Sequence, residues 1–222
     1  GLEQDAGNAN LFSVPAAATL DATGIDRLLA GGLYINVHTT AVPTGELRGQ
    51  ILPQDFALVF ADLEGFAAVP QVDSAASGRA AVTLNEVTGA LVVQANVSGL
   101  DDATQAHVHE AYAGDTGPVL VALNQDGGNS GRWFVEDGTL NASGLAAFAA
   151  GRLYVNVHSP ANPGGELRGP IAPAGIEVLY AELSGAQAVP ALETLARGLA
   201  AVTLDAAGSM GTIHVNTRRL DD

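Results

Sequence analysis

The sequence of 222 residues contains no cysteine and no lysine. Without cysteine the chain has no disulfides, thiolate metal sites, iron–sulfur clusters or cysteine nucleophiles. Its nine basic residues, all arginine, stand against 24 acidic ones for a formal net charge of -15, so no basic surface exists to displace the counterions of a nucleic acid. No apolar run approaches the roughly 18 residues of a membrane-spanning helix. We therefore expect neither a nucleic-acid partner nor a membrane span.

The chain repeats itself at a distance of 120 residues. The segment GGLYINVHTTAVPTGELRGQILP at 31–53 matches AGRLYVNVHSPANPGGELRGPIAP at 150–173, and the same shift carries AVTL at 81–84 onto 201–204. A period of this length is too long for a solenoid repeat and suits a sandwich domain.

This repeat divides the chain into three parts. We interpret 54–173 as one complete unit, 1–53 as the C-terminal half of a unit and 174–222 as the N-terminal half of another. One explanation is that the chain was cut from a longer tandem array. The alternative is that the two halves form a second domain without counterparts of 103–121. We favour the array, because the gap would remove a whole strand and loop.

The local pattern predicts strands joined by turns. Apolar and polar side chains alternate in 91–98 and in 153–158, as expected for half-buried strands. One short helix is expected in the complete unit, with Ser143 as its N-cap and Gly151 as its stop. The sequence therefore predicts an all-β protein, a Greek-key or immunoglobulin-like antiparallel β-sandwich with one short helix per unit.

Two segments carry a family resemblance. AHVHEAYAGDTGPVLVAL at 106–123 and LYVNVHSPANPGGELRGPI at 153–171 together resemble the CHRD domain, and GLYINVHTTAVPTGELRGQI at 32–51 is the most specific match. The resemblance implies an immunoglobulin-like β-sandwich of secreted proteins, often in tandem copies, and it implies no enzymatic reaction. On this basis we expect an extracellular or cell-surface protein.

Three histidines form a candidate metal site. His107 and His109 are two residues apart on a predicted strand, which places both rings on one face with Cα atoms about 6.5 to 7 Å apart. His158 ends another strand, on the face opposite its apolar residues. If the two strands are neighbours, three imidazoles meet, a ligand set suited to copper or zinc, with Cu(II) favoured by the usual affinity order. A water, Glu110 or Asp115 could provide a fourth ligand.

This histidine pattern is similar to the copper half of Cu/Zn superoxide dismutases, which would map onto His107, His109 and His158. The sequence departs from that family in lacking a bridging histidine, a neighbouring zinc cluster, a disulfide and an identifiable basic guide residue. The resemblance therefore implies copper binding rather than dismutase activity.

The remaining histidines receive different interpretations. His38 occupies the position of His158 in an incomplete unit, so we expect weak metal binding unless another chain supplies partners. His214 is expected to be an exposed strand residue outside any metal site.

A second polar set recurs at the repeat distance, with Glu46 and Arg48 copied as Glu166 and Arg168. Because residues two apart share one face of a strand, we interpret each as a charge pair that holds a loop or sheet edge. The alternative, a catalytic acid, lacks a second carboxylate nearby.

The sequence therefore predicts an extracellular, non-enzymatic CHRD repeat protein that binds one copper ion, with zinc as the alternative, through His107, His109 and His158. A second hypothesis is a structural or adhesive module of an extracellular fibre or surface layer, in which the histidines only form hydrogen bonds and the split units associate between chains. A copper redox enzyme is a third alternative.

Overall fold

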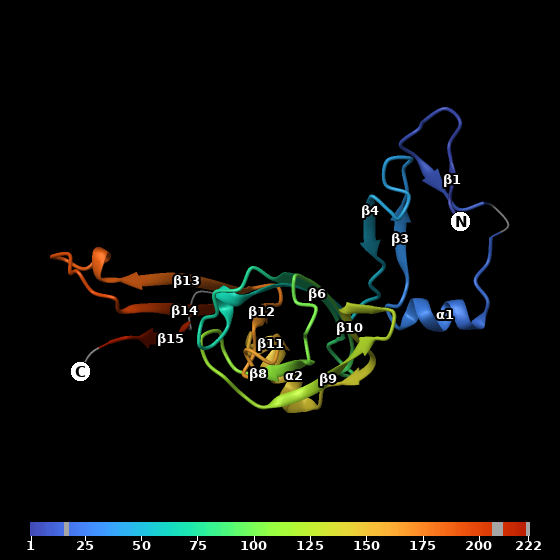
Figure 1. Cartoon of the computed structure of the whole chain (residues 1–222). Helices are drawn as coiled ribbons and strands as arrows, with labels where there is room; N and C mark the ends of the chain where they lie inside the picture. Colours follow the sequence, from blue (N-terminus) through green and yellow to red (C-terminus); the bar gives the residue numbers. More distant parts are fainter. Residues whose placement is uncertain (16–17, 206–210, 221–222) are drawn as a thin grey trace. The chain divides into compact units, whose positions relative to one another are not determined.

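The computed structural model of the chain describes residues 1–15, 18–205 and 211–220 (Figure 1). Residues 221–222, the end of the predicted half-unit 174–222, lie outside the described residues. The chain divides into two units, Gly1–Gln54 and Asp55–Asp222.

A closed antiparallel barrel of eight strands forms most of the larger unit (Figure 1). Around the barrel the strands lie in the order β10-β7-β6-β5-β12-β11-β8-β9. Their bounds are β5 Phe56–Glu64, β6 Ser77–Asn85, β7 Ala90–Ser98, β8 Gln105–Glu110, β9 Val119–Asp126, β10 Asn129–Thr139, β11 Leu153–His158 and β12 Leu167–Ile171, with a 3-10 turn at Gly65–Ala67 and helix α2 at Ala142–Ala149.

The prediction of an all-β antiparallel fold is confirmed, whereas the predicted sandwich is replaced by a barrel. Strand β12 pairs with β5, with Arg168 opposite Glu64. This pairing joins two strands that would be separate sheet edges in a sandwich. On the other side β9 pairs with both β8 and β10. Strand alternation cannot distinguish the two folds, because both bury one face of every strand.

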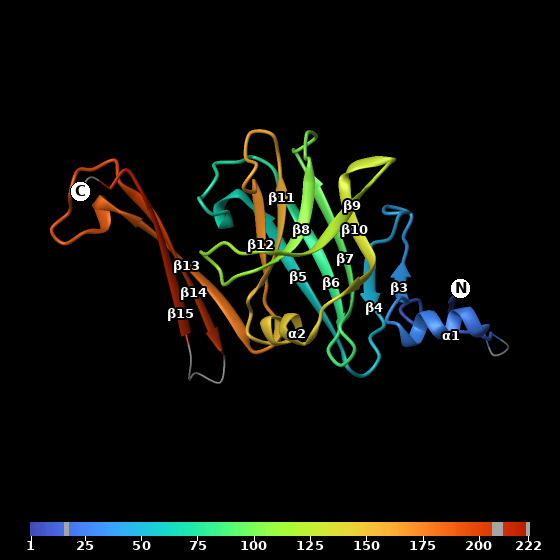
Figure 2. The ribbon, with the colours of Figure 1, turned by 90° about the horizontal axis from the view of Figure 1, so that it is seen from below.

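The barrel core is filled from one face of each strand. The alternate residues predicted to share a face of β7, namely Leu91, Val93, Ala95 and Val97, are all buried in it. Helix α2 lies at one end of the barrel (Figure 2), where Ala147 and Phe148 enter the same cluster. Trp133, the single tryptophan of the chain, is buried there too and provides a spectroscopic probe of the barrel.

A Greek-key connection determines which strands are neighbours at the site. Strands β8, β9 and β10 follow one another as hairpins, and the chain then returns through α2 to place β11 beside β8. Residues far apart in sequence thereby share one face of a two-strand ladder.

The helix is located correctly by the sequence but capped by a different residue. Asn141 is the N-cap, and its side chain accepts a hydrogen bond from the backbone N–H of Gly144 at 2.9 Å. Ser143, the predicted cap, lies inside the helix and donates to the Asn141 side chain. Gly151 ends the helix as predicted, with a φ of 66° that favours glycine.

Three strands, β13 Ile176–Ser184, β14 Arg197–Asp205 and β15 Gly211–Arg218, form a separate antiparallel sheet, with a 3-10 turn at Gly185–Gln187. Their pairing reproduces that of β5, β6 and β7 at a shift of 120 residues: Ile176 lies opposite Asp205, as Phe56 lies opposite Asn85.

The smaller unit contains β1 Glu3–Gln4, β2 Phe12–Ser13, α1 Ala22–Leu29, β3 Tyr34–Val37 and β4 Leu47–Gln50. Strand β3 pairs with β4 in the register of β11 with β12, since Tyr34 lies opposite Gln50 and Tyr154 opposite Pro170. Across the described residues of both units, no helix is long and apolar enough to cross a membrane.

The capping geometry predicts the effect of two neighbouring substitutions. Asn141→Ala should lower the free energy of unfolding by about 1 kcal/mol, because it removes the side-chain acceptor of the Gly144 backbone N–H. Ser143→Ala is the matched control and should cost less than about 0.5 kcal/mol. Denaturant unfolding followed by Trp133 fluorescence measures both, and a larger loss for Ser143→Ala would contradict the assignment.

Candidate metal centre

Strands β8 and β11 carry the three predicted histidines on one face of their ladder. His109 lies opposite Tyr154 and His107 opposite Asn156, and His158 follows two residues further along β11. The intervening residues of both strands, among them Val108 and Val157, point into the barrel core. The three histidines therefore project from the outer surface of the barrel wall.

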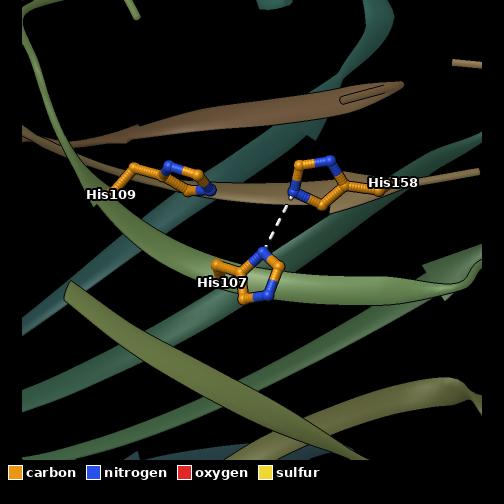
Figure 3. A group of neighbouring side chains, drawn as sticks. All are labelled: His107, His109 and His158. Carbon is orange, nitrogen blue, oxygen red and sulfur yellow. Dashed lines mark hydrogen bonds between the residues drawn. The ribbon is translucent and has the colours of Figure 1, made fainter. Parts of the chain in front are cut away.

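The three rings converge on one another (Figure 3). The ring centroids of His107 and His158 are 5.0 Å apart, those of His107 and His109 are 5.4 Å apart, and those of His109 and His158 are 5.8 Å apart. One ring nitrogen from each histidine lies within 4.8 Å of the other two. Nδ1 of His107 is 3.1 Å from Nε2 of His158.

Backbone carbonyls determine which nitrogens carry protons. Nδ1 of His109 donates to the carbonyl of Gly117 at 3.0 Å, and Nδ1 of His158 donates to that of Pro163 at 3.0 Å. A carbonyl only accepts, so in the neutral rings Nε2 of both histidines holds a lone pair. Nε2 of His109 is buried with no hydrogen-bond partner among the described residues. The lone pair of His109 Nε2 is thus buried and unused, and that of His158 Nε2 is engaged only by the neighbouring ring of His107. Both are of the type that metals bind.

The pKa of each histidine of the cluster, His107, His109 and His158, is lowered from its ordinary value. Burial is the main cause at all three positions. The charges of the neighbouring histidines lower the pKa values of His107 and His109 further, and Arg168 adds to this at His109. The hydrogen bonds to Gly117 and Pro163 oppose the shift. All three rings are therefore neutral at neutral pH, the form that binds metal.

A stack of side chains supports the site from one side. The ring of His109 lies against that of Tyr154, with centroids 5.0 Å apart and planes 12° apart. The guanidinium carbon of Arg168 lies 3.6 Å from the centroid of the same tyrosine ring. Arg168 is buried, and it donates to the carbonyls of Tyr112 and Asp115 at 2.9 and 2.6 Å. It thereby anchors the segment between β8 and β9.

Arg168 is a basic residue beside the site that sequence reasoning missed. Its interpretation as the partner of Glu166 is wrong, because the Glu166 carboxylate accepts from Ser74, Ser159 and Asn162. The physical reason is that Glu166 precedes the first residue of β12, so strand alternation does not relate the two side chains. The available signal in the sequence was that this arginine recurs as Arg48, and that a Leu-Tyr pair precedes it in both copies.

The earlier copy shows the same departure from a charge pair. Glu46 accepts from Thr39 at 2.6 Å, whereas Arg48 donates to Gln50 at 3.0 Å and lies over the Tyr34 ring. No ion pair joins Glu46 to Arg48 among the described residues.

The two acidic candidates for a fourth ligand do not join the cluster. Glu110 forms an ion pair with Arg152 at 2.7 Å and, by strand alternation, lies on the other face of β8 from the histidines. Asp115 accepts from the backbone N–H of Thr116. Within the described parts of the chain, the only candidate group of three or more ligands is His107, His109 and His158.

The other histidines are not members of this group of ligands. His38 donates from Nδ1 to the carbonyl of Pro43 at 3.0 Å, as His158 does to Pro163. His214 is only partly exposed, contrary to the expectation of an exposed side chain, because its ring stacks on Tyr112 with centroids 6.2 Å apart.

Comparison with known proteins identifies the class of this antiparallel barrel protein. The model of the CHRD domain matches residues 1–51 and 59–171, and the chain therefore belongs to the CHRD domain family. The chain is 31% identical over 167 residues to Chordin of Xenopus laevis, an alignment that covers 68% of this chain and 17% of that protein. No solved structure matches the chain.

The lowered histidine pKa values predict that the metal-free barrel loses stability on acidification. Above about pH 6.5 both folded and unfolded chains hold neutral rings. Below it the unfolded chain binds protons that the folded site still excludes, so the free energy of unfolding falls with pH.

Denaturant unfolding of the chelated protein between about pH 7.5 and about pH 5.5 measures this dependence. His109→Gln should show a smaller loss of stability over that range than the unmodified chain. Equal losses of stability in the two proteins would contradict the assignment of this pH dependence to the histidine cluster.

Proposed function

We propose that the barrel binds one Cu(II) ion through Nδ1 of His107 and Nε2 of His109 and His158, as a non-enzymatic function of an extracellular protein. The observation that carries the proposal is the buried Nε2 of His109, which has no partner in the described structure and belongs to a cluster in which one nitrogen of each ring lies within 4.8 Å of the others. The hydrogen bonds to Gly117 and Pro163 support the proposal, because they fix the tautomers in which Nε2 of His109 and of His158 carries no proton.

The spacing of the nitrogens suits a common ion. Nitrogen ligands about 2.0 to 2.1 Å from one metal are at most about 4.2 Å apart. The observed spread of up to 4.8 Å therefore closes by small side-chain rotations. His107 must move its Nδ1 proton to Nε2, which is possible for a neutral imidazole because the two tautomers exchange through solvent. His107 is the most exposed of the three.

The donor set supports copper over zinc. Three neutral nitrogens without a thiolate suit either metal, and Cu(II) binds such sites more tightly in the usual affinity order. Membership in the CHRD family, together with the resemblance to secreted proteins, supports an extracellular location and a role without catalysis.

Titration of the chelated protein with Cu(II) tests the proposal. We expect one ion per chain by calorimetry and nitrogen couplings in the paramagnetic resonance spectrum. His109→Ala should weaken binding by more than about 100-fold, since it removes the donor with no other partner. Zn(II) should bind at the same site more weakly.

The chain provides matched controls in two histidines outside the cluster. His38→Ala and His214→Ala should each bind copper as the unmodified chain does. Unchanged affinity in His109→Ala, or loss of binding in His38→Ala, would refute the assigned ligands.

A further inference from the structure

The sheet β13-β14-β15 exposes the face whose counterpart forms the barrel core. Leu179 is 51% exposed, whereas Val59, its counterpart 120 residues earlier, is 8% exposed. Ile213 is 65% exposed and its counterpart Val93 is fully buried. This open face includes the large exposed side chains Leu179, Leu183, Ile213 and Val215.

The opposite face of this sheet is already occupied. Leu199, Ala201 and Thr203 alternate with the open-face residues of β14 and are buried. Asn216 donates to the carbonyl of Gly114 at 2.6 Å, and His214 stacks on Tyr112. The sheet therefore packs its outer face on the barrel and leaves the core-type face without a cover among the described contacts of this unit.

The smaller unit exposes the complementary set. Ile35 is 46% exposed and Leu47 is 65% exposed, whereas their counterparts Val155 and Leu167 are fully buried. Ile51 is exposed as well, although its counterpart in the barrel is buried. Residues that complete a core in 55–173 are thus on the surface in 1–54.

The barrel shows how these two kinds of surface cover each other. Leu167 and Val155, from β12 and β11, share one apolar cluster with Val59 and Val93, from β5 and β7. Strands β12 and β5 also pair directly, with Arg168 opposite Glu64. The surface of 1–53 is therefore of the type that packs on the surface of 174–222.

One hydrogen bond in the barrel joins residues from these two surfaces, and their counterparts in the half-units have the same chemistry. In the barrel the Ser74 hydroxyl donates to Oε1 of Glu166 at 2.7 Å, while Ser159 holds Oε2. The counterparts of Ser74 and Glu166 are Thr194 and Glu46, again a hydroxyl and a carboxylate. Thr39 holds Oε2 of Glu46 in the same way, which leaves Oε1 positioned for a hydroxyl donor.

We propose that residues 1–53 of one copy of this chain pack on the open face of β13-β14-β15 of a second copy, so that the copies join head to tail. In this arrangement Arg48 of one copy lies opposite Ser184 of the next, and Glu46 accepts from Thr194. The contact uses two different surfaces and leaves one of each free on every pair, so it propagates as an open polymer. Residues 1–222 contain one His-x-His pair, His107 and His109, so this contact adds no second three-histidine group.

Two complementary variants of the full chain test this arrangement. Leu47→Glu disables the first surface and Ile213→Glu the second. The unmodified chain should form filaments in negative-stain microscopy and large species in sedimentation velocity, and each variant alone should sediment as a monomer. An equal mixture of the two should stop at dimers, since only one intact pair of surfaces remains.

Controls make each outcome decisive. Val87→Glu changes a 69% exposed apolar residue on the β6–β7 turn, outside both surfaces, and should polymerise like the unmodified chain. His109→Ala should polymerise without binding copper, which separates this proposal from the metal site. Trp133 fluorescence checks that the barrel of every variant is folded. A monomeric unmodified chain, dimers of either variant alone, or a mixture without dimers would overturn the proposal.

The register is testable because the chain contains no cysteine. A chain with Arg48→Cys mixed with a chain with Ser184→Cys should form a disulfide-linked pair on mild oxidation. Arg48→Cys mixed with Val87→Cys should not. Equal cross-linking in the two mixtures would reject the proposed pairing.

Discussion

The pairing of β11 with β8 is the constraint on which the site depends. It places His158 beside two histidines that are about 50 residues earlier, with Tyr154 opposite His109. Val155 and Val157 fix this register, because a slip of one residue would expose both valines and turn His158 into the core. The hydrophobic core therefore sets the geometry of a polar cluster on the other face of the same strands.

The surroundings of the cluster disfavour a proton on His109 and are compatible with the proposed metal ion. Burial and the positive charge of Arg168 reduce the affinity of His109 for a proton, which uses a single lone pair. The same charge opposes a metal ion, but an ion shared by three nitrogens gains three bonds against one repulsion. The carbonyls of Tyr112 and Asp115 accept from Arg168 and offset its charge locally, and the Tyr154 ring separates it from the histidines.

Sequence patterns predicted the local structure better than the long-range contacts. Alternation identified the strands and the shared face of His107 and His109, and Gly151 marked the helix end. Predicting that His158 lies near this pair required only the assumption that the two strands are neighbours. Closure of the barrel was beyond reach because it depends on edge pairing at Arg168, which leaves no periodic trace. The role of that arginine was missed for the same reason, since its acceptors are loop carbonyls 53 and 56 residues away.

The repeat relates the proposed copper site to the proposed assembly without making one depend on the other. The exposed apolar faces of β13-β14-β15 and of the smaller unit are costly in water, and the residues that correspond to them in the barrel cover one another in its core. Covering them between copies removes both from water and extends the sheet edges that would otherwise remain open. Since only the complete barrel holds the pair His107 and His109, such a polymer would carry its histidine clusters at a spacing set by the copies. The proposed assembly would bury the two apolar faces, whereas the histidine cluster proposed to bind copper lies on the outer wall of the barrel, so substitutions can test each proposal without disturbing the other.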